Sequence, residues 1–284
     1  MNHTQLRDNL RETYNKYAQE RETSTMQEWK IGERSKFLSL LQNEGKKTLL
    51  EIGSGTGRDS KFFHDQGLDV VCVDLSPAMV ELCRQKGLTA YVMDMADIQF
   101  PAGSFDAVYS MNSLLHLTKV EFPAVLRKLD MLLKTDGAVF IGIYGGQEYE
   151  GVWENDAYVP KRFFSFFTDE GIKQEVTRVF NIVSFANIQT EPEDTLHFQS
   201  LILRKKPSES SVDLPIDSIQ FGYSVFSRSF NVAGCIRPRN SNRSPMLTTP
   251  PIANIVRIPQ NSATKPASIA PIGPIPQLMK RLAL

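Results

Sequence analysis

A glycine-rich segment after a short apolar run places the strongest constraint on how this chain can fold. The run 48–52 is followed by three alternating glycines, Gly53, Gly55 and Gly57, and then by a helical pattern over 58–66. Glycine allows sharp turns and lets a ligand approach the backbone. A helix N-terminus behind such a loop presents free N–H groups. The segment therefore predicts a strand, a binding loop and a helix, the unit of α/β sheets.

The same alternation of strand and helix continues along the chain, which predicts a doubly wound α/β fold. Helical segments lie between most of the first five expected strands, and this favours a parallel sheet with helices on both faces. The last two expected strands have no helix between them, which predicts an antiparallel hairpin at one edge of a mostly parallel, seven-stranded sheet. The expected strands are 48–52, 69–74, 89–93, 105–111, 138–144, 179–188 and 196–204, and the expected helices are 26–41, 58–66, 77–86, 119–133 and 168–178.

Charge and proline divide the chain into two parts. The 284 residues hold 32 basic and 32 acidic side chains. Residues 207–284 hold eight basic groups, three acidic groups and 11 of the 16 prolines, so they carry +5 and residues 1–206 carry −5. Proline at this density breaks helices and central strands. We expect one folded domain over 1–206 and a disordered, Pro/Ser-rich basic tail over 207–284, either an interaction segment or a non-native extension.

Several classes of protein are excluded by the cysteines and by the distribution of apolar residues. Cys72, Cys83 and Cys235 are odd in number and lack CxxC spacing, so neither a disulfide framework nor a metal site is expected. Residues 1–28 lack the apolar core of a signal peptide, and no apolar run reaches the ~18 residues of a membrane span. The acidic balance of residues 1–206 disfavours a phosphate backbone. We expect a cytoplasmic protein whose folded part binds no nucleic acid and no membrane; the partner of the tail stays open.

An acid at the end of the second expected strand indicates what the glycine loop binds. Asp74 ends the run 69–74, 21 residues after Gly53. In doubly wound folds an acid at this place accepts hydrogen bonds from ribose hydroxyls. The dinucleotide pattern G-x-G-x-x-G does not fit, because Arg58 stands where that pattern has its third glycine. We expect a ribose-bearing ligand at the C-terminal ends of the strands.

Three ordered segments resemble one enzyme family. Residues 49–58 (LLEIGSGTGR) resemble motif I of the class I S-adenosylmethionine-dependent methyltransferases. Residues 105–110 (FDAVYS) and 132–138 (LLKTDGA) resemble that family's fourth-strand motif and its segment before strand five. The resemblance covers about residues 12–206 and is greatest to small-molecule members of the methyltransferase 11/25 group. It implies a Rossmann-like fold and S-adenosyl-L-methionine as the cofactor; a nucleotide-binding oxidoreductase and a non-catalytic, cofactor-binding regulatory module are the alternatives.

The resemblance also implies a set of cofactor-binding residues. It places the glycine loop along the methionine moiety, Asp74 on the ribose hydroxyls, Asp94 on the adenine amino group, and Leu75 and Met95 at the adenine ring. Glu51 would help to hold the amino group of the methionine moiety, and like Asp94 it could instead be structural. The implied set is Glu51, Gly53, Ser54, Gly55, Asp74, Leu75, Asp94, Met95, Ser110 and Met111.

Methyl transfer from a sulfonium needs few catalytic groups, because the leaving group is already activated and the enzyme mainly aligns and desolvates the reactants. His116, after the fourth strand, is the candidate base, with an orienting or packing role as the alternative. Tyr144 and Arg162 are the polar candidates of an aromatic-rich connection that could form the acceptor pocket or an extra packing layer. Tyr14 and Tyr17 could close over the cofactor or lie on the surface.

The segment after the fourth strand also narrows the acceptor. It runs Ser110-Met111-Asn112-Ser113 and lacks the Asn/Asp-Pro-Pro-aromatic motif of methyltransferases that act on exocyclic amines of nucleic acids. The chain has no Pro-Cys nucleophile of the kind that cytosine-C5 enzymes use. We therefore expect transfer of the methyl group to an O or N atom of a small-molecule acceptor.

Overall fold

The computed structural model describes residues 3–190 and 196–207. The tail expected at 207–284 lies outside the described residues apart from its first residue, and so does Cys235. Within the described ranges, no helix is both long enough and apolar enough to cross a membrane.

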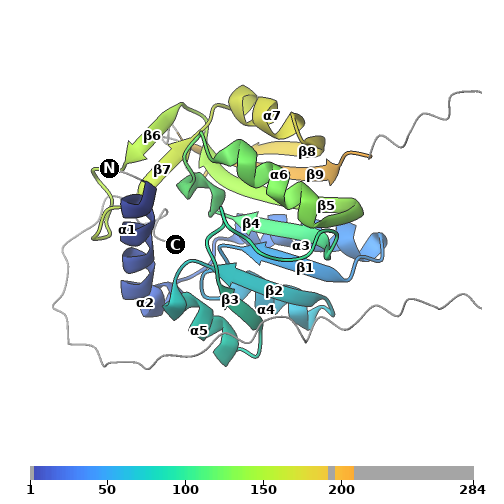
Figure 1. The fold of residues 1–284 in the computed structure, drawn as a ribbon, viewed down its shortest axis with the longest axis horizontal. Coiled ribbons are helices and arrows are strands. Elements are labelled where there is room, and N and C mark those ends of the chain that lie inside the picture. The colour runs from blue at the N-terminus through green and yellow to red at the C-terminus, as the bar shows by residue number, and fades with distance from the viewer. Residues whose placement is uncertain (1–2, 191–195, 208–284) are drawn as a thin grey trace, which may run out of the picture. The chain divides into compact units, whose positions relative to one another are not determined.

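One sheet of seven strands runs through the described part of the chain (Figure 1). Its strands are β1 (Thr48–Ile52), β2 (Asp69–Asp74), β3 (Thr89–Val92), β4 (Phe105–Met111), β5 (Leu133–Gly145), β8 (Phe180–Ile188) and β9 (His197–Lys205). They are arranged in the order β3-β2-β1-β4-β5-β9-β8, and the first five are parallel. β9 runs antiparallel to β5, and β8 runs antiparallel to β9. The predicted sheet with its C-terminal antiparallel hairpin is confirmed.

The strand order reverses beside β1. The chain passes from β1 to β2 and β3 on one side and then crosses over to β4 on the other side. In open α/β sheets, ligands bind in the crevice at the C-terminal ends of the strands where the order reverses. The loop that begins at Gly53 leaves β1 at this point.

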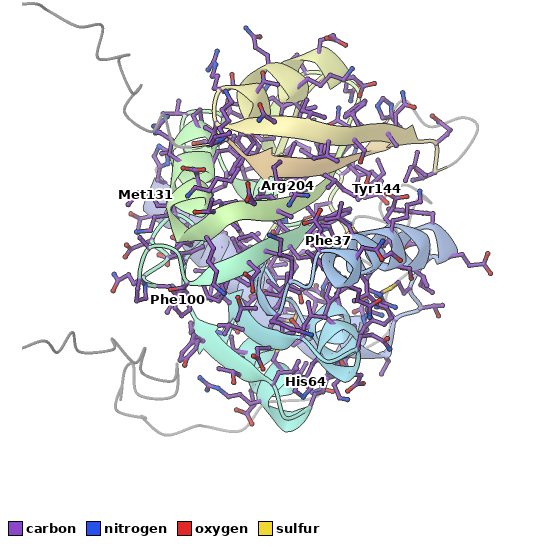
Figure 2. The ribbon with its side chains drawn as sticks, turned by 90° about the vertical axis from the view of Figure 1, so that its right-hand side faces the viewer. Phe37, His64, Phe100, Met131, Tyr144 and Arg204 are labelled. Atoms are coloured by element: carbon purple, nitrogen blue, oxygen red, sulfur yellow. The ribbon has the colours of Figure 1, made fainter. Side chains whose placement is uncertain are left out.

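Helices cover both faces of the sheet, as predicted. They are α3 (Glu28–Asn43), α4 (Arg58–Asp65), α5 (Pro77–Gln85), α6 (Phe122–Leu132) and α7 (Asp169–Thr177). Phe37 of α3 and Phe63 of α4 belong to one buried cluster with Leu49, whereas Leu126 of α6 belongs to another with Leu50. Because neighbouring residues of a strand point to opposite faces, these two clusters lie on opposite faces of the sheet. Figure 2 shows Phe37 and Met131, the latter on α6, on opposite sides.

Two of the helices begin at a side chain that caps their first turn. The side chain of Ser76 accepts a hydrogen bond from the Met79 N–H at 3.2 Å, with Pro77 in the first helical position of α5. The side chain of Thr168 accepts one from the Gly171 N–H at 3.0 Å at the start of α7. These bonds satisfy N–H groups that have no partner inside the helix.

Four elements gather at the end of the sheet where the parallel strands end, and none of them was predicted (Figure 1, left). They are α1 (His3–Lys16), α2 (Ala18–Thr23) and the antiparallel pair β6 (Tyr149–Val152) and β7 (Phe163–Phe166). All four residues of β7 are buried, so this strand lacks the apolar and polar alternation by which a strand is recognised. The aromatic-rich connection thus contains a small second sheet.

Candidate active site

The glycine loop after β1 has a backbone that only glycine adopts easily. Gly53, Gly55 and Gly57 have φ angles of +66°, +54° and +79°. A Cβ atom on Gly53 would lie 2.2 Å from the Cβ of Ser113, and one on Gly57 would lie 2.8 Å from the Sγ of Cys83. Around Gly55 no protein atom lies within 4 Å of such a Cβ position. The first and third glycines are therefore required for packing, and the second leaves open space beside the loop.

Asp74 at the end of β2 is held by this loop. Its Oδ2 accepts a hydrogen bond from the Gly55 N–H at 2.9 Å, and its Oδ1 accepts one from the Ser76 N–H at 2.8 Å. Burial raises the pKa of this carboxyl to about 6, although both N–H groups favour the charged form. Each carboxylate oxygen can accept a second hydrogen bond. Asp74 can therefore bind a diol without losing its present contacts.

Three adjoining pockets form one cleft above these residues. The α1 pocket, of about 450 Å³, lies between α1 and Asp94. The middle pocket, also about 450 Å³, contains Asp74 and shares lining residues with both of its neighbours. The α3 pocket, of about 550 Å³, lies between Lys30 of α3 and Glu51. The cleft thus follows the ends of β1, β2 and β4.

Nine of the ten residues predicted to bind the cofactor line this cleft, and Ser110 does not. Ser110 is buried beneath it, where its hydroxyl shares a hydrogen bond of 2.6 Å with that of Ser113. Ser113 in turn donates to the carbonyl oxygen of Ile52 at 2.7 Å. The residues that line the cleft are Glu51, Gly53, Ser54, Gly55, Asp74, Leu75, Asp94, Met95 and Met111.

The two acids of the α3 pocket do not present free negative charge. Glu51 is buried and accepts a hydrogen bond from the hydroxyl of Ser60. Burial, reinforced by the nearby charge of Asp59, raises the pKa of Glu51 well above its ordinary value. Asp59 itself is paired with Arg34, whose Nη1 lies 2.8 Å from its Oδ1.

The acid of the α1 pocket has a partner that sequence reasoning missed. Arg7 of α1 forms an ion pair with Asp94, and its Nη2 donates to Glu121 at 2.6 Å. The hydrogen bonds and the charge of Arg7 help to lower the pKa of Glu121 to about 2, against the effect of burial. These contacts fasten α1 over the pocket. They join residues about 90 or more positions apart, and no local signal in the sequence points to them.

Tyr14 and His116 form a hydrogen-bonded pair at the wall of the middle pocket. The Tyr14 hydroxyl lies 2.7 Å from the Nε2 of His116, and the Nδ1 of His116 lies 2.7 Å from the carbonyl oxygen of Phe163. A carbonyl oxygen only accepts, so Nδ1 carries the proton and Nε2 accepts from Tyr14. Burial and the nearby Arg162 cation lower the pKa of His116 to about 3. His116 is therefore neutral in this arrangement at neutral pH.

Arg162 contacts this pair through the Tyr14 hydroxyl and is itself held by Asp156. Its Nε and Nη2 each donate to the carboxylate of Asp156 at 2.8 Å, and both side chains are buried. Its Nη1 donates to the Tyr14 hydroxyl at 3.4 Å. The guanidinium also lies over the ring of Tyr158, 4.4 Å from its centroid. A buried bidentate pair of this kind fixes side-chain positions strongly.

Tyr144, the second candidate for catalysis, lies elsewhere. Its ring packs edge-on against Trp29 and Phe198, with centroids 6.4 Å and 5.7 Å away, and it is 1% exposed. Of the three pockets of the cleft, none is lined by Tyr144. Tyr144, which Figure 2 labels, belongs to β5. Its ring therefore packs inside the protein, as in the extra packing layer that was the alternative for the aromatic-rich connection.

Two further polar residues of the cleft were not singled out from the sequence. Asn112 adopts a left-handed φ of +55°, and within the described part of the chain its buried Oδ1 has no hydrogen-bond partner. Lys30, only 5% exposed, lines the α3 pocket. Asn112 could have been found, because asparagine tolerates left-handed backbone directly after a strand. Lys30 could not, because a lysine at the start of a helix gives no sign of burial.

The described residues hold no cluster of three or more histidine, cysteine or acidic side chains that could bind a metal ion. Cys72 and Cys83 are both buried and both free. The cleft presents carboxylates, an amide, cations and the Tyr14–His116 pair.

Comparison with known sequences identifies the central part of the chain. Residues 49–137 match the family described as methyltransferase domain. Phosphoethanolamine N-methyltransferase of Plasmodium falciparum is 26% identical over 54% of this chain and 59% of its own length. Malonyl-[acyl-carrier protein] O-methyltransferase of Serratia marcescens is 26% identical over 44% of this chain and 49% of its own length. The chain thus spans about half the length of the curated relatives that it matches.

Solved structures share the fold. A Burkholderia thailandensis 1,6-didemethyltoxoflavin-N1-methyltransferase, solved with that compound and S-adenosylhomocysteine, superposes with a TM-score of 0.54. It is 20% identical, over 69% of this chain and 87% of that one. A methyltransferase from Methanosarcina mazei gives a TM-score of 0.51 at 16% identity, over 56% of this chain and 92% of that one. At these identities the likeness concerns the fold.

The cleft also fits S-adenosylmethionine, the cofactor of that family. Asp74 keeps acceptor capacity for a ribose diol, and the open space beside Gly55 allows a ligand to lie against the loop. The unpartnered Oδ1 of Asn112 offers an acceptor for an amino group. The motif and the sheet topology agree with the match of residues 49–137 to the methyltransferase domain, and these findings are consistent with a class I S-adenosylmethionine-dependent methyltransferase family.

Proposed function

We propose that this protein transfers the methyl group of S-adenosylmethionine to an O or N atom of a small-molecule acceptor by in-line displacement. The observation that carries the proposal is the Tyr14–His116 pair, which stands in the wall of the middle pocket beside Asp74. The relative from Plasmodium falciparum supports it, since it is named as an N-methyltransferase of phosphoethanolamine, a small molecule. The acidic balance of residues 1–206 favours a small acceptor over a nucleic acid.

The residues of the chain contribute mainly position and desolvation. When bound, the cofactor supplies a methyl group on a sulfonium that is already activated. Asp74 would hold the ribose, the loop from Gly53 to Gly55 the methionine moiety, and Leu75, Asp94 and Met95 the adenine. Helix α1 lines the α1 and middle pockets, where it would shield the bound reactants from water. Alignment in a dry site accounts for much of the acceleration of such a displacement.

Tyr14 is the residue that we assign to the acceptor, and His116 is the residue that positions it. The Tyr14 hydroxyl donates a hydrogen bond to Nε2 of His116, and its oxygen, which already accepts from Arg162, keeps a second lone pair for an N–H or O–H of the acceptor. The pKa of about 3 makes His116 a weak base in this arrangement. The orienting role considered for His116 is therefore the one that the geometry favours.

A screen with labelled S-adenosylmethionine tests the proposed function. The full chain would be incubated with the labelled cofactor and a fractionated metabolite extract, and the label would be followed in small-molecule and macromolecular fractions. We expect label in one or a few small molecules and none in protein or nucleic acid. Label confined to macromolecules would refute the small acceptor. Binding of S-adenosylhomocysteine without transfer to any fraction would support the regulatory module instead.

We also propose that residues 1–206 form the methyltransferase domain and that residues 207–284 are not needed for its fold. β9 ends at Lys205, where its ammonium donates to the carbonyl oxygen of Leu133 at 3.0 Å and so fastens the end of the strand. Removal of residues 207–284 should therefore leave the midpoint of thermal unfolding and the affinity for S-adenosylhomocysteine unchanged. A loss of either would show that the tail belongs to the domain.

A further inference from the structure

The α3 pocket collects positive charge from three helices. Arg21 of α2, Lys30 of α3 and Arg58 of α4 all line it, beside Gly53 and Ser54 of the glycine loop. Its two acids do not balance this charge, since one is bonded to Arg34 and the other has its pKa raised by burial. The pocket is therefore suited to an anion.

Lys30 is the most unusual of these cations. It is 5% exposed, and among the described residues no hydrogen bond or ion pair holds its ammonium. Arg58, in contrast, donates from Nη1 to the carbonyl oxygen of Ser24 at 2.6 Å. The Lys30 ammonium lies over the ring of Trp29, 5.3 Å from its centroid. A buried charge without a hydrogen bond or an ion pair is still costly, so its retention beside a pocket indicates a ligand that supplies one.

The backbone around Lys30 favours the same kind of ligand. Lys30 lies in the first turn of α3, and Arg58 is the first residue of α4. Helix N-termini carry partial positive charge and free N–H groups, which stabilise carboxylates and other anions. The same end of the helix disfavours a lysine ammonium until an anion arrives.

We propose that Lys30 binds the carboxylate of the cofactor's methionine moiety, an assignment that rests on the proposed function. The glycine loop along which that moiety is expected lines the same pocket. Arg58 and Arg21 add positive charge beside the carboxylate, and Asn112, at the other side of this pocket, accepts from the amino group of the same moiety. The carboxylate of the methionine moiety is thus bound by Lys30 and its amino group by Asn112.

The choice of lysine has a consequence for pH. Burial, together with the charges of Arg21 and Arg58, lowers the pKa of Lys30 to about 7, while Asp59 acts in the opposite direction. Glu51, which also faces the pocket, has a raised pKa. A bound carboxylate favours the ammonium form, so binding at pH 7 takes up about half a proton at this residue. Affinity should therefore fall as the pH rises above about 7.

Calorimetry with two ligands tests the assignment. S-adenosylhomocysteine has the carboxylate, and 5′-methylthioadenosine lacks the amino-acid end altogether. Lys30→Met should lower the affinity for S-adenosylhomocysteine tenfold or more and leave the affinity for 5′-methylthioadenosine unchanged. Titrations at pH 7 in buffers of different ionisation enthalpy should show proton uptake in the wild type that Lys30→Met loses. The matched control is Lys36→Met on the same helix, whose side chain is 66% exposed.

Each other outcome overturns the assignment in a distinguishable way. Equal losses for both ligands would mean that Lys30 supports the fold, and no loss for either would mean that another group binds the carboxylate. Weaker binding of the methyl acceptor alone would place the acceptor's anionic group at Lys30. Failure of the wild type to bind either ligand would refute the proposed cofactor itself. If Lys30→Met unfolds, Lys30→Arg serves instead: it should bind S-adenosylhomocysteine without proton uptake.

Discussion

The two ends of the cofactor cleft are built on opposite principles. At the α3 end Lys30 and Glu51 are buried, and burial shifts the pKa of Glu51 upward and that of Lys30 downward. At the α1 end Arg7, Asp94 and Glu121 are a fifth to a quarter exposed and paired, and the pKa of Glu121 is lowered to about 2. The buried charged groups of the α3 end would gain a partner when a ligand binds, whereas the charged groups of the α1 end are already paired with one another.

This difference has an energetic meaning. Groups whose charged forms are disfavoured by burial reduce the stability of the cofactor-free protein, and the ligand restores that free energy on binding. Exposed ion pairs contribute little to either state. We therefore expect substitutions near the glycine loop to affect cofactor binding far more than substitutions in α1.

The largest effect is expected from Gly53→Ala. The new Cβ would combine a φ of +66° with a contact of 2.2 Å to Ser113. Gly45→Ala is the matched control, because its φ is +64° and nothing lies within 4 Å of its Cβ position. We expect Gly45→Ala to lose about 1 kcal/mol of unfolding free energy and Gly53→Ala about 2–3 kcal/mol more, with no measurable binding of S-adenosylhomocysteine. Equal losses in urea titrations would refute the steric argument.

The next effect is expected from Asp74→Ala. A charged hydrogen bond to a ligand contributes about 1.5–3 kcal/mol, so affinity for S-adenosylhomocysteine should fall tenfold or more. Because burial raises the pKa of Asp74 to about 6, wild-type affinity should also fall as the pH drops through 6 and the carboxylate gains a proton. Asp74→Ala should abolish this pH dependence. Calorimetry between pH 5 and 8 measures both; unchanged affinity in the variant would show that Asp74 does not bind the ribose.

The part of the cleft that could be predicted from the sequence is the part that the sequence encodes locally. The glycine loop, the acid at the end of β2 and the alternation of strands and helices are each contained in short segments. Their backbone geometry depends on residue types that are rare elsewhere, such as glycine at positive φ. Nine of the ten residues that the resemblance implies line the cleft, and their binding of the cofactor stays a prediction.

The part that could not be predicted depends on contacts between distant segments. Tyr14 meets His116 across 102 positions, and Arg7 meets Glu121 across 114. Helix α1 buries only Leu10 and Thr13, too few for an amphipathic pattern to show which surface it covers. The same holds for Tyr144, the last residue of the expected strand 138–144: only its packing against Trp29 shows that its ring lies outside the three pockets.

A smaller effect, confined to turnover, is expected from Tyr14→Phe. The variant keeps the ring but loses the hydroxyl that His116 and Arg162 hold. We expect kcat to fall about tenfold, the size of one lost hydrogen bond to the acceptor, with unchanged affinity for S-adenosylhomocysteine. Tyr17→Phe is the control, since the Tyr17 ring stacks on Tyr158 with centroids 4.1 Å apart and does not line the cleft. A loss of cofactor affinity without a loss of kcat would mean that Tyr14 binds the cofactor and not the methyl acceptor.

The smallest effect is expected from Arg7→Gln, which removes the ion pairs of the α1 end. Exposed pairs contribute about 0.2–1 kcal/mol each, so the free energy of unfolding should change by about 1 kcal/mol at most and affinity for S-adenosylhomocysteine by no more than a few-fold. Arg11→Gln, whose partner Asp8 lies on the same helix, controls for the change of charge.

The direction of the pH dependence follows from Glu121. Its pKa is lowered on folding, so its contribution to stability is present above pH 4.5 and is lost as the pH falls toward 2; Arg7→Gln should reduce that loss. Added salt should lower the free energy of unfolding of the wild type toward that of Arg7→Gln, because salt screens these partly exposed ion pairs. A loss of affinity greater than tenfold in Arg7→Gln would contradict the contrast between the two ends: it would mean that α1 must be fastened before the buried end can bind, and that the cleft closes as one unit.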